Sequence, residues 1–298
     1  LANETLLTTD ELVRVARVAA GLGIVEVRLT GGEPLLRRDV VDVVRGMAAI
    51  ETAEGRMRVS LTTNGLALPG MMAELVDAGL ERVNVSIDTL RRDRYAELTR
   101  RDRLDDALAG IRAARDSGLR PLKLNAVAMR GVNDDELVDL VRFAIDHDAE
   151  LRFIEQMPLD AGHTWKRAEM VTGAEILAAL RREFSLAPIG ERGASPAEVL
   201  AVDGGPATVG VIASVTAPFC GACDRVRLTA DGQIRNCLFA RDESDLRALL
   251  RDPALDEPAR DAAIARVLRA SIAMKRPGHG IDDPGFLQPD RPMSAIGG

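Results

Sequence analysis

The sequence contains 298 residues, of which 46% are hydrophobic, 29% are charged and 3% are aromatic, and its formal net charge is −7. These proportions are ordinary for a globular enzyme, and a chain of this length can bury one large core or two smaller ones. The negative net charge argues against a nucleic-acid-binding surface. This composition, typical of a globular enzyme, leads us to predict a cytoplasmic protein. No apolar run is long enough to cross a bilayer, so we expect no membrane span.

Strands and helices alternate along the first half of the sequence. The region from Thr9 to Gly23 predicts a capped amphipathic helix, since its apolar residues recur every three and four positions. Further strands are expected at 24–30, 58–63, 82–88, 122–129 and 150–157, and further helices at 38–49, 69–78, 104–117 and 134–146. This alternation indicates βαβ units and a parallel sheet.

The second half is less regular. We expect a helix at 173–184, a Gly/Pro-rich stretch at 188–206, a strand at 208–216, a hairpin at 226–237 and helices at 244–251 and 258–275. We place a domain boundary near 160–190 and predict two domains, residues 1–175 and 176–298.

The opening of the sequence predicts an incomplete sheet. A βα fold normally begins on a strand, whereas residues 1–23 indicate a loop and a helix, so we expect a preceding strand to be missing and the sheet to have an open edge. The first residues, Leu1-Ala2-Asn3-Glu4, include no methionine and no basic-then-apolar leader, so we expect no signal peptide and interpret the sequence as a fragment.

Polar side chains gather at the carboxyl ends of the expected strands. They are Arg28, Thr30 and Glu33; Thr62 and Asn64; Ser86 and Asp88; Lys123 and Asn125; and Glu155, followed by Met157. Any one of them could be only a helix cap or a turn former. Together they favour a ligand site, because α/β folds bind ligands where parallel strands end. A lysine buried on a strand, as expected for Lys123, would also need an anion.

All three cysteines of the chain lie close together, as a C-x-x-C pair at Cys220 and Cys223 and a third at Cys237. The pair presents two thiolates to one metal, and the third returns on the far arm of the expected hairpin. A disulfide would leave one cysteine over and suits secreted proteins. Structural zinc would need a fourth ligand, for which Asp224 is a candidate. An iron–sulfur cluster normally takes four thiolates, so three would leave one iron open to a substrate atom.

Two arginines beside the cysteines favour the iron–sulfur interpretation. Arg225 and Arg227 alternate on an expected strand, so both side chains would point to one face beside the metal, where two guanidinium groups can hold phosphate. From the residues alone, the prediction ends at an anionic ligand near a metal cluster. A nucleotide-binding scaffold or a redox protein with one cluster is a second class of function that fits these residues.

The ordered set of motifs resembles the GTP 3′,8-cyclase family of radical S-adenosylmethionine enzymes, which act in molybdenum cofactor biosynthesis. The motifs are the segments 28–35, 61–65, 84–88, 123–127, 131–134 and 152–157, the C-x2-C-x13-C set, the segment 278–281 and the terminal Gly297-Gly298. Each motif is weak alone, but the ordered set is specific and extends over essentially the whole chain.

The resemblance implies an α/β fold: a partial (βα)6 TIM-like barrel without its first strand, and a C-terminal α+β extension that carries an iron–sulfur cluster. It implies conversion of GTP to (8S)-3′,8-cyclo-7,8-dihydroguanosine 5′-triphosphate, the first step of molybdopterin cofactor biosynthesis. In the family, a first [4Fe–4S] cluster is held by a C-x3-C-x2-C motif that would precede residue 1. We therefore expect residues 1–298 to bind GTP without generating a radical; a truncated homologue that binds GTP at a single cluster is the alternative.

The resemblance also implies roles for individual residues. It assigns S-adenosylmethionine contacts to Gly32, Ser86 and Met157, GTP contacts to Arg28, Thr62, Lys123, Arg225, Val226 and Arg227, and a second [4Fe–4S] cluster to Cys220, Cys223 and Cys237. It assigns no catalytic side chain, and it implies that the Gly-Gly end threads into the active site. The expected partners are a second copy of the chain and cyclic pyranopterin monophosphate synthase, which would receive the product.

Overall fold

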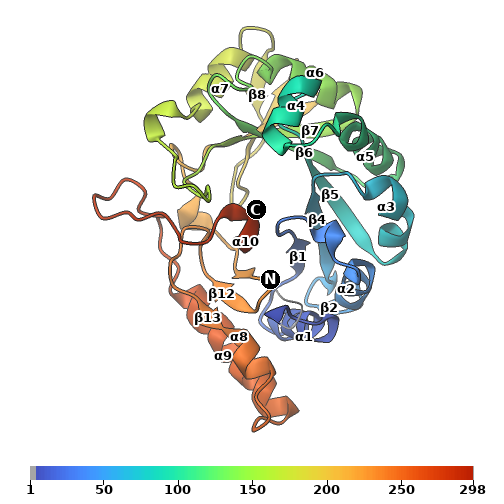
Figure 1. The fold of residues 1–298 in the computed structure, drawn as a ribbon, viewed down its shortest axis with the longest axis vertical. Coiled ribbons are helices and arrows are strands. Elements are labelled where there is room, and N and C mark those ends of the chain that lie inside the picture. Colours follow the sequence, from blue (N-terminus) through green and yellow to red (C-terminus); the bar gives the residue numbers. More distant parts are fainter. Residues whose placement is uncertain (1–4, 298) are drawn as a thin grey trace. The chain divides into compact units, whose positions relative to one another are not determined.

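The computed structural model describes residues 5–297, whose helices and strands are drawn in Figure 1. The chain divides into two compact units. Within these residues the first unit comprises 5–61, 74–81 and 224–297, and the second comprises 62–73 and 82–223. The start of the chain, on which our expectation of a fragment rests, and Gly298 lie outside the described residues. Three elements have residues in both units, namely β4 (Arg58–Thr63), α3 (Leu68–Asp77) and β5 (Leu80–Ser86).

The first unit opens with α1 (Thr9–Ala20), whose start is closed by a capping box. The Thr8 hydroxyl accepts from the Glu11 N–H, and the Glu11 carboxylate accepts from the Thr8 N–H, so two unpaired helical donors are satisfied. Then follow β1 (Glu26–Leu29), η2 (Pro34–Leu36), α2 (Val40–Ala48) and the short hairpin β2 (Glu51–Thr52) and β3 (Gly55–Arg56). Strand β1 pairs in parallel with β4 and is the end strand of the sheet among the described residues.

The first unit also contains a small antiparallel sheet with helices beside it. Its strands are β11 (Arg227–Leu228), β12 (Gln233–Arg235) and β13 (Ser244–Asp245), followed by α8 (Leu246–Leu250), α9 (Glu257–Ala273) and α10 (Met293–Ile296). Figure 1 shows α8 and α9 side by side, and they are in contact. Buried side chains from both ends of the chain form this core: Leu7, Val15 and Ala19, with Ile234, Leu246, Leu250, Ile264 and Leu268. Each large apolar side chain buried there contributes roughly 1.5–3 kcal/mol.

The second unit is a mostly parallel sheet with helices between its strands. Here β5 pairs with β6 (Leu122–Ala128), β6 with β7 (Ala149–Glu155), and β7 with β10 (Thr208–Ile212), all in parallel. Strands β9 (Glu198–Val202) and β8 (Leu186–Pro188) continue the sheet in antiparallel fashion. The helices are α4 (Arg92–Thr99), α5 (Leu104–Asp116), α6 (Leu137–Asp146) and α7 (Gly173–Leu180), with short turns η3 (Arg167–Glu169) and η4 (Cys220–Ala222).

The structure confirms the α/β class with a mostly parallel sheet and corrects several boundaries. Helix α4 was not predicted, and the stretch at 188–206 contains β9, because its residues 198–202 pair with β10 in the folded chain. The strand expected at 208–216 ends at Ile212, and residues 244–245 of an expected helix form β13. The predicted division at 175/176 stays a prediction. Among residues 5–297, no helix combines the length and the apolar character that a membrane span needs.

Candidate functional site

A cluster of charged side chains lies on neighbouring strands of the second unit. Lys123 on β6 is opposite Glu150 on β7, and their Nζ and Oε1 atoms are 4.0 Å apart. Arg152 Nε donates to the same Oε1 at 2.5 Å. The three side chains are only 15%, 15% and 10% exposed. Together these three side chains carry two positive charges and one negative charge, a combination that favours a nearby anion.

Sequence reasoning found Lys123 and its need for an anion but missed the partners on β7. Glu150 and Arg152 are two residues apart, so they lie on the same face of their strand. Thr208 on β10 adds a hydroxyl that donates to Glu150 Oε2 at 3.3 Å. The period-two spacing of two charges inside an otherwise apolar run was the signal that could have predicted this pair.

Two more predicted residues lie along the same face of the second unit's sheet. Asn84 Nδ2 on β5 donates to the Thr62 hydroxyl at 3.3 Å, and Asn84 is opposite Lys123 on β6. Ser86, two residues beyond Asn84, is exposed at the end of β5. Thr62 and Ser86 therefore lie at the carboxyl ends of β4 and β5, where the sequence predicted a ligand site. Lys123 does not, because it is the second residue of β6 and lies at the amino end of that strand, opposite Asn84.

Asp88, another strand-end residue, has a structural role. Its Oδ1 accepts from the Val127 N–H at 2.8 Å, which ties the segment after β5 to the end of β6. Burial raises the pKa of Asp88, and this hydrogen bond partly opposes the rise. Fully buried Asn133 strengthens the same junction, because its amide donates to the carbonyl oxygens of Asp88 and Val127.

In the first unit, the expected tight turn follows β1. Gly31 has a φ of 122°, which side chains rarely adopt, and the Glu33 carboxylate accepts from the Leu35 N–H at 3.0 Å to cap η2. Arg28, on β1, lies 39% exposed with Nε 3.4 Å from the Ser60 hydroxyl and Nη2 3.6 Å from Glu26. The turn that the sequence predicted as a possible cofactor contact is thus present with its main chain accessible at Gly32, which is exposed.

The C-terminal tail lies against this turn within the first unit. A Cβ added to Gly32 would be 3.6 Å from the Ser294 carbonyl oxygen, and one added to Gly297 would overlap the Thr30 hydroxyl. Arg227 Nη1 donates to the Gly297 carbonyl oxygen, and Gly297 has a φ of 81°. A glycine is therefore needed at 297 both for its backbone angle and for its close approach to Thr30.

The cysteine pair forms a tight turn in the second unit. Cys220 begins η4, and the Cys223 N–H donates to the Cys220 carbonyl oxygen at 3.2 Å. Both cysteines are partly exposed. Two cysteine side chains on one turn have the donor chemistry of a metal or iron–sulfur ligand pair.

Cys237 belongs to the first unit and follows β12. Its sulfur accepts from the Phe239 N–H at 3.4 Å, a contact of the kind that tunes cluster thiolates. Among residues 5–297 no group of three His, Cys, Asp or Glu side chains is placed to hold a metal ion. Because the three cysteines are divided between the two units, the ligand set stays a prediction supported by its donor chemistry.

The structure corrects our interpretation of the arginines beside the cysteines. Strand β11 holds only Arg227 and Leu228, so Arg225 precedes it and does not alternate with Arg227 on a strand. Arg225 Nη2 lies 3.7 Å from Asp224 Oδ1. Val226 packs against the core of the first unit, which leaves its main chain as the part suited to a ligand.

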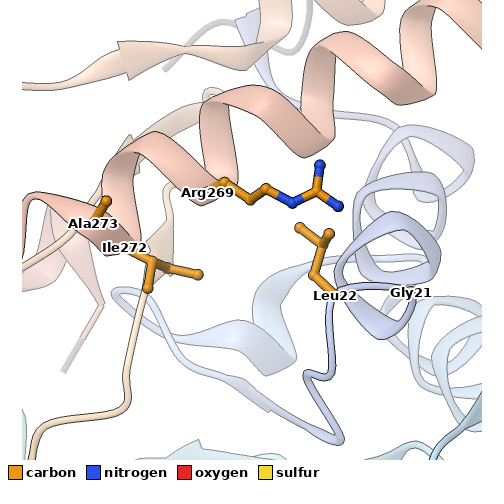
Figure 2. A pocket seen from close by; sticks show the side chains of 5 residues that line it. All are labelled: Gly21, Leu22, Arg269, Ile272 and Ala273. Atoms are coloured by element: carbon orange, nitrogen blue, oxygen red, sulfur yellow. The ribbon is translucent and has the colours of Figure 1, made fainter.

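A depression elsewhere in the first unit involves none of the predicted residues. Gly21, Leu22, Arg269, Ile272 and Ala273 line it, and Figure 2 shows Arg269 extending from α9 toward Leu22 beyond the end of α1. Its lining contains no thiol, carboxylate or imidazole, so we assign it no role in catalysis. The chemistry-bearing residues lie instead at the strand ends, the turn after β1 and the cysteine turn.

Comparisons with known proteins give a consistent result. The Radical SAM superfamily model matches residues 2–144, and the model described as Molybdenum Cofactor Synthesis C matches residues 149–281. The chain is 58% identical to "GTP 3',8-cyclase" of Streptomyces coelicolor, with 100% of this chain and 86% of that protein covered. It is 54% identical to "GTP 3',8-cyclase" of Mycobacterium sp. (strain KMS), with 100% and 83% covered, and 52% identical to the protein of that name from Corynebacterium glutamicum (strain R), with 100% and 80% covered.

A solved structure shares the fold. The crystal structure of Streptococcus suis SuiB bound to S-adenosylmethionine superposes with a TM-score of 0.57 at 13% sequence identity. The match covers 87% of this chain and 60% of that chain. At this identity the likeness supports the arrangement of strands and helices alone.

Proposed function

The chain belongs to the family of GTP 3′,8-cyclases within the radical S-adenosylmethionine superfamily, and from this we propose that it converts GTP to (8S)-3′,8-cyclo-7,8-dihydroguanosine 5′-triphosphate. One observation carries the proposal: the chain is 52–58% identical, over its whole length, to relatives that bear this activity as their name. The reaction would be the first step of molybdenum cofactor biosynthesis, with which the two matched family models agree.

Membership of this superfamily implies [4Fe–4S] clusters and S-adenosylmethionine. We propose that Cys220, Cys223 and Cys237 hold one cluster, leaving one iron without a protein ligand. When bound and reduced, a radical-generating cluster supplies the electron that cleaves S-adenosylmethionine. The protein's contribution would be to orient the cofactor: the main chain of Gly32, the exposed hydroxyl of Ser86 and the half-buried side chain of Met157 are the proposed contacts.

For GTP we propose contacts in each unit. In the second unit, Lys123 and the hydroxyl of Thr62 lie on one face of the sheet, and the net positive charge of the Lys123, Glu150 and Arg152 cluster favours a polyphosphate. In the first unit, Arg28, Arg225, Arg227 and the main chain of Val226 are the proposed contacts. The Gly297 carbonyl would hold the Arg227 guanidinium in place, which reduces the entropy lost when it binds phosphate.

We further propose that the chain forms a homodimer and that its product passes to cyclic pyranopterin monophosphate synthase. The negative net charge supports the absence of a nucleic-acid partner. These partners rest on the family resemblance.

The test uses residues 1–298 and the same residues extended by an N-terminal segment that carries a strand and C-x3-C-x2-C. Both are reconstituted anaerobically with iron and sulfide, reduced with dithionite and given GTP and S-adenosylmethionine. Three cysteines are too few for two clusters, so residues 1–298 should bind GTP without releasing 5′-deoxyadenosine. The extended chain should release both 5′-deoxyadenosine and cyclised GTP.

Two results would count against the proposal. Failure of the extended, reconstituted chain to make cyclised GTP would reject the proposed activity. Turnover by residues 1–298 alone would show that the radical chemistry does not need the upstream cysteines.

A further inference from the structure

Glu155, the last residue of β7, is a fully buried carboxylate with four hydrogen-bond donors. It accepts from the Gly173 N–H at 2.6 Å, the Val215 N–H at 2.8 Å and the Thr216 N–H at 2.9 Å, and also from the Thr216 hydroxyl. Hydrogen bonds to an ionised group are stronger than neutral ones, and leaving such a buried group without partners is costly. One side chain therefore fixes two other segments of the second unit.

The two segments have different characters. Gly173 is the first residue of α7, where the helix dipole favours a carboxylate. Val215 and Thr216 belong to the irregular connection that leaves β10 and reaches Cys220. The sequence predicts a strand that extends to residue 216, but β10 ends at Ile212. The backbone hydrogen bonds of the sheet therefore do not hold residues 213–219. The Glu155 carboxylate accepts hydrogen bonds from backbone N–H groups that would otherwise bond to a neighbouring strand.

Arg192 holds the same connection nearer to the cysteines. Its Nη1 donates to the Ala217 carbonyl oxygen at 3.1 Å, and its guanidinium carbon lies 5.0 Å from the centroid of the Phe219 ring. Its remaining nitrogens donate to the Ser195 and Pro196 carbonyl oxygens, which anchors the guanidinium itself. The approach to the cysteine turn is thus fixed at 215–216 by Glu155 and at 217 and 219 by Arg192.

We propose that Glu155 is a positioning residue for the Cys220–Cys223 turn, assisted by Arg192. It fixes the connection that presents both thiols, and it does so from the end of β7, two residues before Met157. The strand end that carries the proposed S-adenosylmethionine contact and the connection that carries two cluster ligands therefore share one buried carboxylate. The cluster itself rests on the proposed function, whereas the link from Glu155 to the cysteine turn rests on the hydrogen bonds alone.

The test measures the thiols of the cluster-free, reduced chain. Glu155→Gln keeps the side-chain volume but places an amide N–H against main-chain N–H donors. Losing one charged hydrogen bond should make local opening of 213–219 on the order of tenfold more frequent. Iodoacetamide should therefore alkylate Cys220 and Cys223 faster by about that factor, while Cys237, in the other unit, keeps its rate; peptide mass spectrometry resolves the three sites.

Glu136→Gln is the matched control. Glu136 is also buried in the second unit and accepts from the Thr89 hydroxyl at 2.6 Å, the Leu90 N–H at 2.8 Å and the Arg94 guanidinium. The Glu136→Gln substitution also removes buried hydrogen bonds, but Glu136 does not contact the 213–219 connection. The alkylation rates of all three cysteines should therefore stay near those of the unchanged chain. Equal acceleration of all three thiols by Glu155→Gln, or equal behaviour of the two variants, would reduce Glu155 to a general stabilising residue and overturn the proposal.

Two further measurements keep the result decisive. If Glu155→Gln does not fold, Arg192→Ala removes the contacts with Ala217 and Phe219. It should selectively raise the alkylation rates of Cys220 and Cys223, by a smaller factor. The absence of a selective rise would reject the proposed positioning of the cysteine turn. After reconstitution, the Glu155→Gln protein should lose iron to a chelator several-fold faster than the unchanged protein. If the unchanged chain takes up no iron, the proposed cluster fails, but the alkylation pattern still decides the role of Glu155.

Discussion

Replacing Glu150 by glutamine tests whether the charged cluster on β6 and β7 retains a positive charge suited to an anionic ligand. The carboxylate faces Lys123 Nζ at 4.0 Å and Arg152 Nε at 2.5 Å. Glutamine keeps the volume and one acceptor oxygen but removes the negative charge. The net charge of the three side chains then rises from one positive charge to two.

The expected loss of stability follows from the burial of the cluster. Removing one partner of a buried ion pair destabilises a protein by about 3–5 kcal/mol, because the other charge is left uncompensated. Here the side chains are 10–15% exposed and glutamine retains an acceptor, so we expect the lower end, about 3 kcal/mol. Glu183→Gln is the control: its pair with Arg142 is 49–55% exposed, and such surface pairs contribute about 0–1 kcal/mol.

Urea unfolding at neutral pH measures both variants, with and without inorganic tripolyphosphate. The midpoint should fall in Glu150→Gln at unchanged slope, and tripolyphosphate should stabilise this variant more than the unchanged protein, since it meets the larger positive charge. A Glu150→Gln loss no greater than that of Glu183→Gln, or equal stabilisation by tripolyphosphate, would refute this account of the cluster.

Three further predictions concern the backbone and the pH dependence. A Cβ at Gly110 would overlap the Gly65 carbonyl oxygen, so Gly110→Ala should lower the free energy of unfolding by about 1–3 kcal/mol in urea, whereas Gly70→Ala, whose Cβ meets open space in α3, should not. Gly297→Ala should release the C-terminal tail from Thr30 and Arg227, so carboxypeptidase should digest the tail faster. Gly278→Ala, where an added Cβ meets open space, is the control, and equally slow digestion of the two variants would contradict the close packing at Gly297. The Thr172 N–H, then the Arg130 guanidinium, lowers the pKa of Glu175 from 4.5 to about 2, so its stabilising contribution is present above pH 4.5 and is lost as the pH falls toward 2. Thermal melts across this range should show a smaller loss in Glu175→Gln than in the unchanged protein, and parallel curves would reject the assignment.

Several elements could be predicted from the sequence because local patterns determine them. Strand β4 has the predicted bounds, and α5 and α9 begin and end within two residues of the predicted ones. Their apolar residues recur at the period of the element, and this period is a local property of the chain. The cysteine spacing and the polar residues at the strand ends were equally visible, since each belongs to a short segment.

The partners of these residues were decided by the tertiary structure. Lys123 meets Glu150 because the register of β6 on β7 places them opposite one another. Glu155 takes its donors from residues 18 and 60 positions away, and Arg227 meets Gly297 across 70 positions. In the same way, α1 shares a core with α9 although the two helices lie near opposite ends of the chain. Such pairs form only when several strands and helices pack together and bury their apolar faces at the same time. No local period or propensity therefore encodes which distant group contacts a given residue.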